Sequence, residues 1–134
     1  MESRSRSVLL VDDNSDDVAL AQRALKRSGL SATMEVAYSG NEGWERLIEK
    51  SPRALFLDLN MPGVSGFDLL QRVRADARTR DVPVIILTTS KEPSDIHRCY
   101  SLGANSFVTK PVDFTEFIEV FGQMMRYWTD LNQV

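Results

Sequence analysis

Short apolar runs alternate along this chain with longer segments of helical periodicity, and no other feature limits the fold as strongly. The runs are Val8–Val11, Met34–Ala37, Ala54–Leu57, Val82–Leu87 and Ser106–Val108. They are almost continuously apolar, as expected of parallel strands that are buried on both faces. Strands that alternate with helices form a parallel sheet with helices on both sides. The pattern therefore predicts an α/β protein with five strands and five helices.

Residues typical of helix N-termini precede the predicted helices. They are Asn14 with Asp17 three residues later, Ser39 with Glu42 at capping-box spacing, Ser65, Pro93 and Asp113. The Asn, Ser and Asp side chains accept hydrogen bonds from the free N–H groups of a first turn. Proline suits a first helical position because it needs no N–H there. These signals predict one helix after each strand.

The length and charge of the chain limit its class. With 134 residues we expect a single domain over 1–134, with its core at about 7–128 and short tails that include the basic Ser3–Arg6 stretch. The formal net charge of −3 disfavours a nucleic-acid surface, which needs a basic face. One cysteine, Cys99, excludes an internal disulfide and suits a reducing compartment. The longest apolar run is far shorter than the ~20 residues that span a bilayer, so we expect a cytoplasmic protein.

Carboxylates, hydroxyls and one ammonium follow four of the predicted strands. Asp12 and Asp13 follow the first strand, Asp58 the third, Thr88, Thr89 and Ser90 the fourth, and Thr109 and Lys110 the fifth. In such sheets, ligands bind beyond the C-terminal strand ends. Crowded carboxylates repel one another unless a cation lies between them, and hard oxygen donors favour Mg²⁺. His97 and Cys99 are the only residues of their types, which argues against zinc.

This set of side chains suits phosphoryl transfer. A carboxylate can accept a phosphoryl group as an acyl phosphate when a metal and a second cation neutralise the phosphoryl oxygens. Asp58 is the candidate nucleophile, Lys110 the second cation and Thr88 a hydrogen-bond donor. Asp16 and Asp17 are interpreted differently, because negative charge in the first turn of a helix is stabilised by the helix dipole. We therefore do not assign these two to the metal.

Four motifs resemble the receiver domains of two-component response regulators, and the similarity extends from Val8 to about Trp128. The motifs are Val8–Asn14, Leu57–Gly63, Ile86–Thr88 and Ser106–Pro111. Their spacing is typical of the family. The resemblance implies a flavodoxin-like, doubly wound, five-stranded parallel sheet of order 2-1-3-4-5 that carries a phosphoacceptor.

The resemblance also implies individual roles. The metal ligands, for Mg²⁺ or Mn²⁺, are Asp13, Asp58, the backbone carbonyl of Asn60, and Asp12 mostly through water. Asp58 is the phosphoacceptor, and Lys110 pairs with the phosphoryl group. Thr88 moves toward that group on activation, and the rotamer of Phe107 follows Thr88. The bond between Lys110 and Pro111 resembles a cis peptide of the family.

A narrower similarity is to the small regulators that partner bacterial phytochromes. It rests on Leu87–Asp95 and on the late pair Tyr127 and Trp128. The implied partner is a sensor histidine kinase, in this case a phytochrome, with neither nucleic acid nor membrane involved. The chain would then be the substrate of a kinase, with autodephosphorylation, rather than an enzyme. One departure is Arg53, where the family often has Asp, at the opposite end of the third strand from the acids.

Other functions of this architecture match less well. An FMN-binding protein would need a Ser/Thr/Gly-rich loop after the first strand, where Asp12 and Asp13 would repel a phosphate. A phosphatase with an aspartyl-phosphate intermediate would place a general acid two residues after the nucleophile, where Asn60 cannot serve. A phosphate sink is an alternative, and so is a pseudo-receiver that acts only as an interaction module. The pseudo-receiver would be expected to lack one of Asp13, Asp58 or Lys110.

The last predicted helix has a wider apolar arc than packing on a sheet requires. At 100° per residue, one stripe contains Phe114, Phe117, Ile118, Phe121, Met124, Met125 and Trp128. Val120, Tyr127 and Leu131 widen it to roughly 180°, against about 100° for a helix packed on a sheet. A contiguous apolar extension favours a partner surface. Because the family often dimerises through its fourth helix, fifth strand and fifth helix, we expect a two-fold homodimer that uses Val120, Tyr127 and Leu131.

Overall fold

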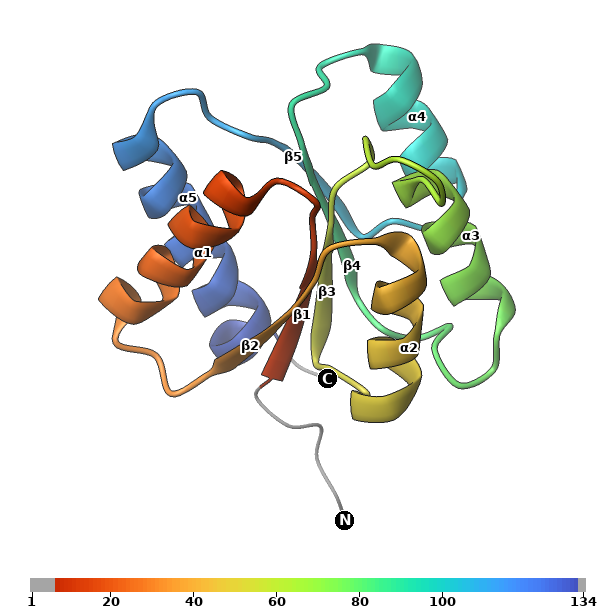
Figure 1. Cartoon of the computed structure of the whole chain (residues 1–134), viewed down its shortest axis with the longest axis horizontal. Helices are drawn as coiled ribbons and strands as arrows, with labels where there is room; N and C mark the ends of the chain where they lie inside the picture. The colour runs from red at the N-terminus through yellow and green to blue at the C-terminus, as the bar shows by residue number, and fades with distance from the viewer. Residues whose placement is uncertain (1–6, 133–134) are drawn as a thin grey trace.

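Five strands and five α-helices alternate along the chain in the computed structural model, which describes residues 7–132. The Ser3–Arg6 stretch lies outside the described residues. The elements are β1 (Ser7–Val11), α1 (Ser15–Ser28), β2 (Thr33–Ala37), α2 (Gly40–Lys50), β3 (Ala54–Leu57), α3 (Gly66–Ala75), β4 (Val84–Thr88), α4 (Pro93–Ser101), β5 (Ser106–Thr109), α5 (Phe114–Arg126) and a π-helix, η1 (Tyr127–Leu131). Every strand pairing is parallel, in the order β2-β1-β3-β4-β5 (Figure 1). The predicted fold class and strand order are confirmed.

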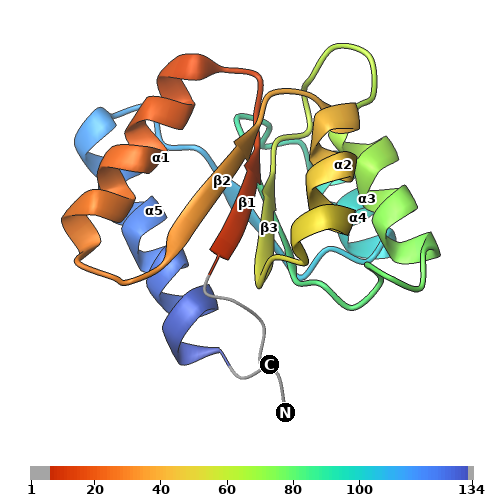
Figure 2. The ribbon, with the colours of Figure 1, turned by 60° about the horizontal axis from the view of Figure 1, so that its bottom comes forward.

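The central strands β1, β3 and β4 are almost entirely apolar because helices cover both faces of the sheet, whereas the edge strands β2 and β5 include polar residues such as Glu35 and Ser106. Helices α1 and α5 lie side by side over one face, and α2, α3 and α4 cover the other (Figure 2). Successive residues of β1 alternate between the two layers: Leu9 and Val11 pack toward α2 and α3, while Val8 and Leu10 pack toward α1 and α5. The same alternation continues in β3 and β4, and each layer has its own hydrophobic core.

The predicted fourth strand begins two residues too early. The backbone N–H of Val82 donates to the carbonyl of Thr79 at 3.1 Å and so closes the turn after α3, and Pro83 has no N–H to donate. The strand β4 therefore starts at Val84. An apolar run does not distinguish a strand residue from a buried turn residue, which is why the sequence overestimated its length.

The residues predicted to begin helices all do so. Asn14, Ser39, Ser65 and Asp113 accept a backbone hydrogen bond from the first turn of their helices, and Pro93 stands at the start of α4. At Ser39 only half of the expected capping box forms. The Glu42 carboxylate accepts from the N–H of Tyr38 at 2.7 Å instead of the N–H of Ser39. The full reciprocal box is found at Ser65 with Asp68.

The end of the last helix differs from the expectation of constant α-helical periodicity. The helix α5 ends at Arg126 and continues as η1, whose wider turn is closed by the Asn132 N–H donating to the Tyr127 carbonyl at 2.6 Å. The wider turn shifts side chains away from the positions that 100° per residue predicts. Tyr127 and Leu131 are 48 % and 59 % exposed, while Thr129 between them is buried.

Two further residues of the predicted stripe differ from expectation. Phe114 was assigned to the packed side, but it is the first residue of α5 and is 71 % exposed. Val120 was assigned to the outer edge, but it is partly buried against the core between α1 and α5. Met124 and Met125 are buried in that core as expected.

Candidate functional site

The main-chain position of each functional residue is fixed by the strand next to it. The N–H of Asp12 donates to the last residue of β2 at 3.0 Å, and the N–H of Asp58 donates to the last residue of β1 at 3.0 Å. The N–H of Lys110 donates to the last residue of β4 at 2.7 Å. The sheet hydrogen bonds thus continue one residue past the strands. This places the two acids and the lysine at one edge of the sheet, as predicted.

Three carboxylates converge at this edge. Asp12, Asp13 and Asp58 each offer one oxygen, and these oxygens all lie within 4.8 Å of one another. Asp12 and Asp58 are buried, at 1 % and 6 % exposure, whereas Asp13 is exposed to solvent. Such a donor set is hard, anionic and partly open to water, which is what a Mg²⁺ site requires. The acidic triad is the kind of site that receiver domains use for Mg²⁺.

The Lys110 ammonium is buried among these acids. Its Nζ lies 2.8 Å from Oδ2 of Asp12, 2.8 Å from Oδ2 of Asp17 and 3.6 Å from Oδ2 of Asp58. The Lys110 side chain is only 5 % exposed. Two of its three N–H donors are therefore engaged by carboxylates, and the ammonium remains close to the Asp58 oxygen.

The site holds more negative charge than its single lysine neutralises. Burial raises the pKa of Asp58, and the nearby Asp12 charge adds to this, although Lys110 acts in the opposite direction. Burial likewise raises the pKa of Asp12 against the hydrogen bond from Lys110. Burial alone would lower the pKa of Lys110, but its hydrogen bonds to Asp12 and Asp17 raise it. A further cation between the carboxylates would relieve this imbalance.

The candidate switch residues lie on neighbouring strands. Thr88 is fully buried at the end of β4, and its hydroxyl accepts a hydrogen bond from the Asn60 side-chain amide at 3.4 Å. Phe107 of β5 pairs with Ile86, two residues before Thr88, so the two candidates face the same side of the sheet. Phe107 is partly buried against the core on the α2, α3 and α4 side. The two candidate switch residues therefore lie on one face of the sheet, on adjacent strands.

Two residues important to the site were missed from the sequence. Asp17 was interpreted only as a first-turn acid, yet its carboxylate accepts directly from Lys110. Tyr100 of α4 was not considered, and its hydroxyl accepts the backbone N–H of Phe107 at 3.1 Å. The only sequence signal for Asp17 is its place in the helix that directly follows Asp12 and Asp13. Nothing local in the sequence signals Tyr100, because the contact depends on how α4 packs.

Some of the predicted hydroxyls serve the loops instead of the acids. The Ser90 hydroxyl donates to Asp95 at 2.6 Å, and the Thr109 hydroxyl donates to the Ser90 carbonyl at 3.4 Å. Thr89 is exposed. These contacts shape the connection between β4 and α4. Of the hydroxyls at the strand ends, Thr88 is the one whose surroundings include Asp58.

The cis peptide expected between Lys110 and Pro111 is not found. No peptide bond within residues 7–132 is cis. Before proline the trans form is favoured by roughly 0.5–1 kcal/mol, so trans is the ordinary isomer. With this bond trans, the Lys110 side chain still reaches Asp12.

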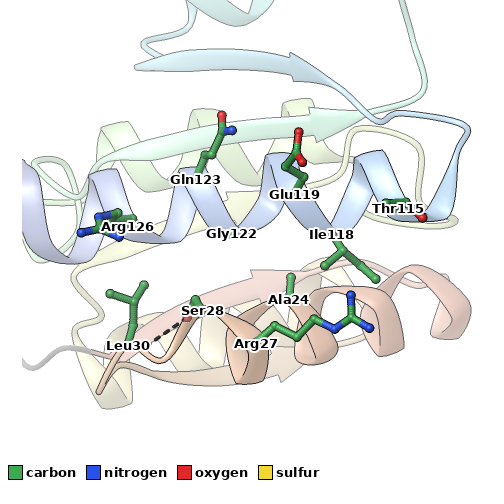
Figure 3. A pocket seen from close by; sticks show the side chains of 10 residues that line it. All are labelled: Ala24, Arg27, Ser28, Leu30, Thr115, Ile118, Glu119, Gly122, Gln123 and Arg126. Carbon is green, nitrogen blue, oxygen red and sulfur yellow. Dashed lines mark hydrogen bonds between the residues drawn. The ribbon is translucent and has the colours of Figure 1, made fainter.

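A separate groove of about 370 Å³ lies along the seam between α1 and α5 (Figure 3). Ala24 and Ile118 point toward each other across it, whereas Glu119 and Gln123 point away from α1. Gly122 leaves the wall of the groove open, because a Cβ there would meet no atom within 4 Å. The groove contains none of the carboxylates at the strand ends and is not part of the acidic site.

Known proteins with a similar sequence or structure point to the same kind of domain. The profile of the response regulator receiver domain matches residues 8–121. The chain is 33 % identical to "Probable methanogenesis regulatory protein FilR2" of Methanothrix harundinacea, over 94 % of this chain and 85 % of that protein.

Two similar solved structures are the phosphorylated cyanobacterial phytochrome response regulator RcpA and the bacteriophytochrome response regulator AtBRR. RcpA has a TM-score of 0.89 and 25 % identity, covering 98 % of both chains. AtBRR has a TM-score of 0.73 and 35 % identity, covering 98 % of this chain and 100 % of the other. With the profile match over most of its length and an acidic site at the expected strand ends, the chain belongs to the response regulator receiver domain family.

Proposed function

We propose that Asp58 accepts a phosphoryl group from a phosphorylated histidine of a sensor kinase, in a Mg²⁺-dependent reaction that switches or relays a signal. The observation that carries this proposal is the placement of the Asp58 carboxylate beside two other carboxylates and 3.6 Å from the Lys110 ammonium. Acyl phosphate formation needs an anionic oxygen nucleophile. Phosphoryl transfer also needs positive charge around the transferred group, and the same cluster offers a lysine and a metal site.

The donor set supports Mg²⁺, with Mn²⁺ as a substitute. We assign Asp13 and Asp58 as direct ligands, the Asn60 backbone carbonyl as a further ligand, and Asp12 as a ligand mostly through water. Oxygen donors of this kind, one side of which is exposed, suit a cation that keeps part of its water shell. When bound, Mg²⁺ neutralises the phosphoryl oxygens and orients them for in-line attack.

In the proposed step, a carboxylate oxygen of Asp58 attacks phosphorus while the P–N bond to the kinase histidine breaks. The products are an acyl phosphate on Asp58 and a free imidazole on the kinase. Lys110 donates to one phosphoryl oxygen, and the Thr88 hydroxyl moves to donate to another. The Phe107 ring then changes rotamer and fills the space that the Thr88 side chain has left. Later attack by water on phosphorus releases inorganic phosphate and returns Asp58 to its carboxylate, so the chain is the substrate of a kinase with autodephosphorylation of its own.

We further propose that the kinase is a phytochrome. The support is that RcpA and AtBRR, which are described as phytochrome and bacteriophytochrome response regulators, are similar to this chain over nearly its whole length. A role as phosphate sink is a second candidate for the same chemistry. A pseudo-receiver is less well supported, because Asp13, Asp58 and Lys110 are all in place at the site.

The proposal places residues 1–134 in one cytoplasmic domain that meets its kinase in solution. No helix within the described part of the chain has the length and apolar character needed to cross a bilayer.

We also propose a homodimer through α4, β5 and α5. Its support is the exposure of Tyr127 and Leu131 in η1, which continues α5, whereas Val120 of α5 is partly buried. Light scattering with and without phosphorylation tests the dimer, and a monomer mass in both states would contradict it. The double variant Tyr127→Lys and Leu131→Lys is expected to dissociate it.

Labelling with a phosphorylated kinase or a small phosphodonor tests the acceptor assignment. Wild type is expected to gain a label in Mg²⁺ that is labile in both acid and base, as acyl phosphates are, and Asp58→Asn is expected to gain none because an amide is a poor nucleophile. Asp81→Asn is the matched control, since Asp81 is exposed and precedes β4 at the opposite edge of the sheet. Equal labelling of Asp58→Asn and wild type would refute the assignment. A panel of kinases that includes a phytochrome kinase tests the partner.

A further inference from the structure

Asp17 contacts the reaction centre from the first turn of α1. Its Oδ2 lies 2.8 Å from Nζ of Lys110, the same distance as the contact between Lys110 and Asp12. The side chains of Lys110 and Asp17 are 5 % and 21 % exposed, so this ion pair is mostly shielded from solvent. A charge-assisted hydrogen bond of this length in a shielded place is stronger than an ordinary surface ion pair.

Asp17 differs from the other acids around Lys110 in one respect. Asp12 and Asp58 belong to the cluster of three carboxylates that can hold a metal ion, and Asp17 does not. A cation and Lys110 would therefore draw on the same two carboxylates, those of Asp12 and Asp58. Among the carboxylates that contact Lys110 at hydrogen-bond distance, Asp17 is the one that can serve the lysine alone.

The backbone holds Asp17 firmly in this position. The Asn14 side chain accepts from the N–H of Asp17 at 3.1 Å and from the N–H of Asp16 at 3.0 Å, which fixes the first turn of α1. The rest of α1 packs against the sheet and α5 through buried residues such as Val18. The Asp17 carboxylate is thus presented by a packed helix instead of a mobile loop.

We propose that Asp17 is a positioning residue, the dedicated counter-ion that keeps the Lys110 ammonium beside Asp58 when a metal ion occupies Asp12 and Asp58. This inference rests on the proposed function, because it concerns the lysine that neutralises the phosphoryl group. An ammonium has three N–H donors, and Asp17 binds one of them in a way that metal binding leaves intact. Without Asp17, Lys110 either competes with the metal for Asp12 and Asp58 or leaves the buried site. Both outcomes would slow phosphorylation.

Three variants and a matched control test this role. Asp17→Asn removes the charge, Asp17→Ala removes the side chain, and Asp17→Glu keeps the charge on a longer stem. Asp16→Asn is the control, since Asp16 occupies the same first turn and loses the same charge, but its side chain is exposed. The helix dipole therefore affects both positions alike, and only Asp17 contacts Lys110.

The first measurement is the NMR signal of the Lys110 ammonium in unphosphorylated protein, with and without Mg²⁺. In Asp17→Asn and Asp17→Ala we expect solvent exchange of the ammonium protons to become about tenfold faster or more, the factor that one hydrogen bond to a charged group corresponds to. The effect should be larger in Mg²⁺ than without it. Asp16→Asn should match wild type, and Asp17→Glu should restore part of the protection.

The second measurement is the rate of labelling of Asp58 by a small phosphodonor at saturating Mg²⁺. We expect about a tenfold loss in Asp17→Asn, partial rescue in Asp17→Glu and no change in Asp16→Asn. Lys110 signals that are the same in Asp17→Asn and wild type, in Mg²⁺, would overturn the inference, whatever the labelling rate. If instead wild type fails to become labelled while the Lys110 signal responds to Asp17, the proposed function fails and the counter-ion role of Asp17 stands.

Discussion

The substitution Gly66→Ala tests how tightly α3 is packed against the strand that carries Asp58. A Cβ built on Gly66 would lie 2.4 Å from the Asp58 carbonyl oxygen and 2.6 Å from Cα of Leu59. Both are backbone atoms, and the Gly66 N–H already donates to the Leu59 carbonyl at 3.0 Å. The methyl group therefore cannot be accommodated by rotating a side chain. The start of α3 or the residues after β3 must move.

The size of the effect follows from these contacts. Moving the oxygen contact from 2.4 Å to an acceptable 3.0 Å requires a displacement of about 0.6 Å in packed backbone. Overpacking of this kind costs about 1–3 kcal/mol, and we take about 3 because backbone is the obstacle. Gly66 has no positive φ, so alanine recovers about 0.5–1 kcal/mol from lower entropy of the unfolded chain. The expected net loss is about 2 kcal/mol.

Gly122→Ala is the matched control. It is the same substitution within α5, where a Cβ would meet no atom within 4 Å, so it should stabilise the protein by about 0.5–1 kcal/mol. Urea unfolding with an m-value of about 1.5 kcal/mol/M then separates the two midpoints by about 2 M. Equal midpoints for the two variants would show that the reasoning about Gly66 is wrong. Labelling of Asp58 should also fall in Gly66→Ala alone, since the displaced carbonyl is its own.

Three other predictions follow from the site and its surroundings. Asp13→Asn should weaken Mg²⁺ binding about tenfold or more through loss of an anionic ligand, whereas Lys110→Ala should leave binding largely intact, as a fluorescence or NMR titration with Mg²⁺ would measure. Burial raises the pKa of Asp58 in the folded protein above its ordinary 3.8. The protonated carboxyl therefore favours folding below about pH 3.8, and this contribution is lost as pH rises through the pKa of the folded state. Without Mg²⁺, Asp58→Asn should be more stable than wild type at pH 7 and lose this advantage near pH 3, as urea unfolding at each pH would measure. Arg74 donates to the carbonyls of Gly103, Arg80 and Val82 and to the Asn105 side chain, so Arg74→Lys should lower the free energy of unfolding by about 2–3 kcal/mol, and a loss below 0.5 kcal/mol would contradict this role.

The sequence alone was sufficient for the fold and for most of the site. Central strands buried on both faces are apolar at nearly every position, and helices tend to begin at residues that satisfy free N–H groups, so both signals are local. Once the strands are parallel, residues that follow them meet at one edge wherever they stand in the chain. For this reason the sequence predicts that Asp12, Asp58 and Lys110 lie at the same edge of the sheet.

The tertiary structure decided which of these side chains touch and which face solvent. The contact between Asp17 and Lys110 joins residues 93 positions apart and depends on where the first turn of α1 lies relative to the residue that follows β5. The hydroxyl of Tyr100 reaches Phe107 only because α4 packs against the edge of β5. Periodicity also assumes one helical pitch, so it could not show that the chain widens into a π-helix at Tyr127. Local patterns encode strands, helices and the edge of a sheet, whereas contacts between elements depend on how their side chains pack together, and no single segment contains that information.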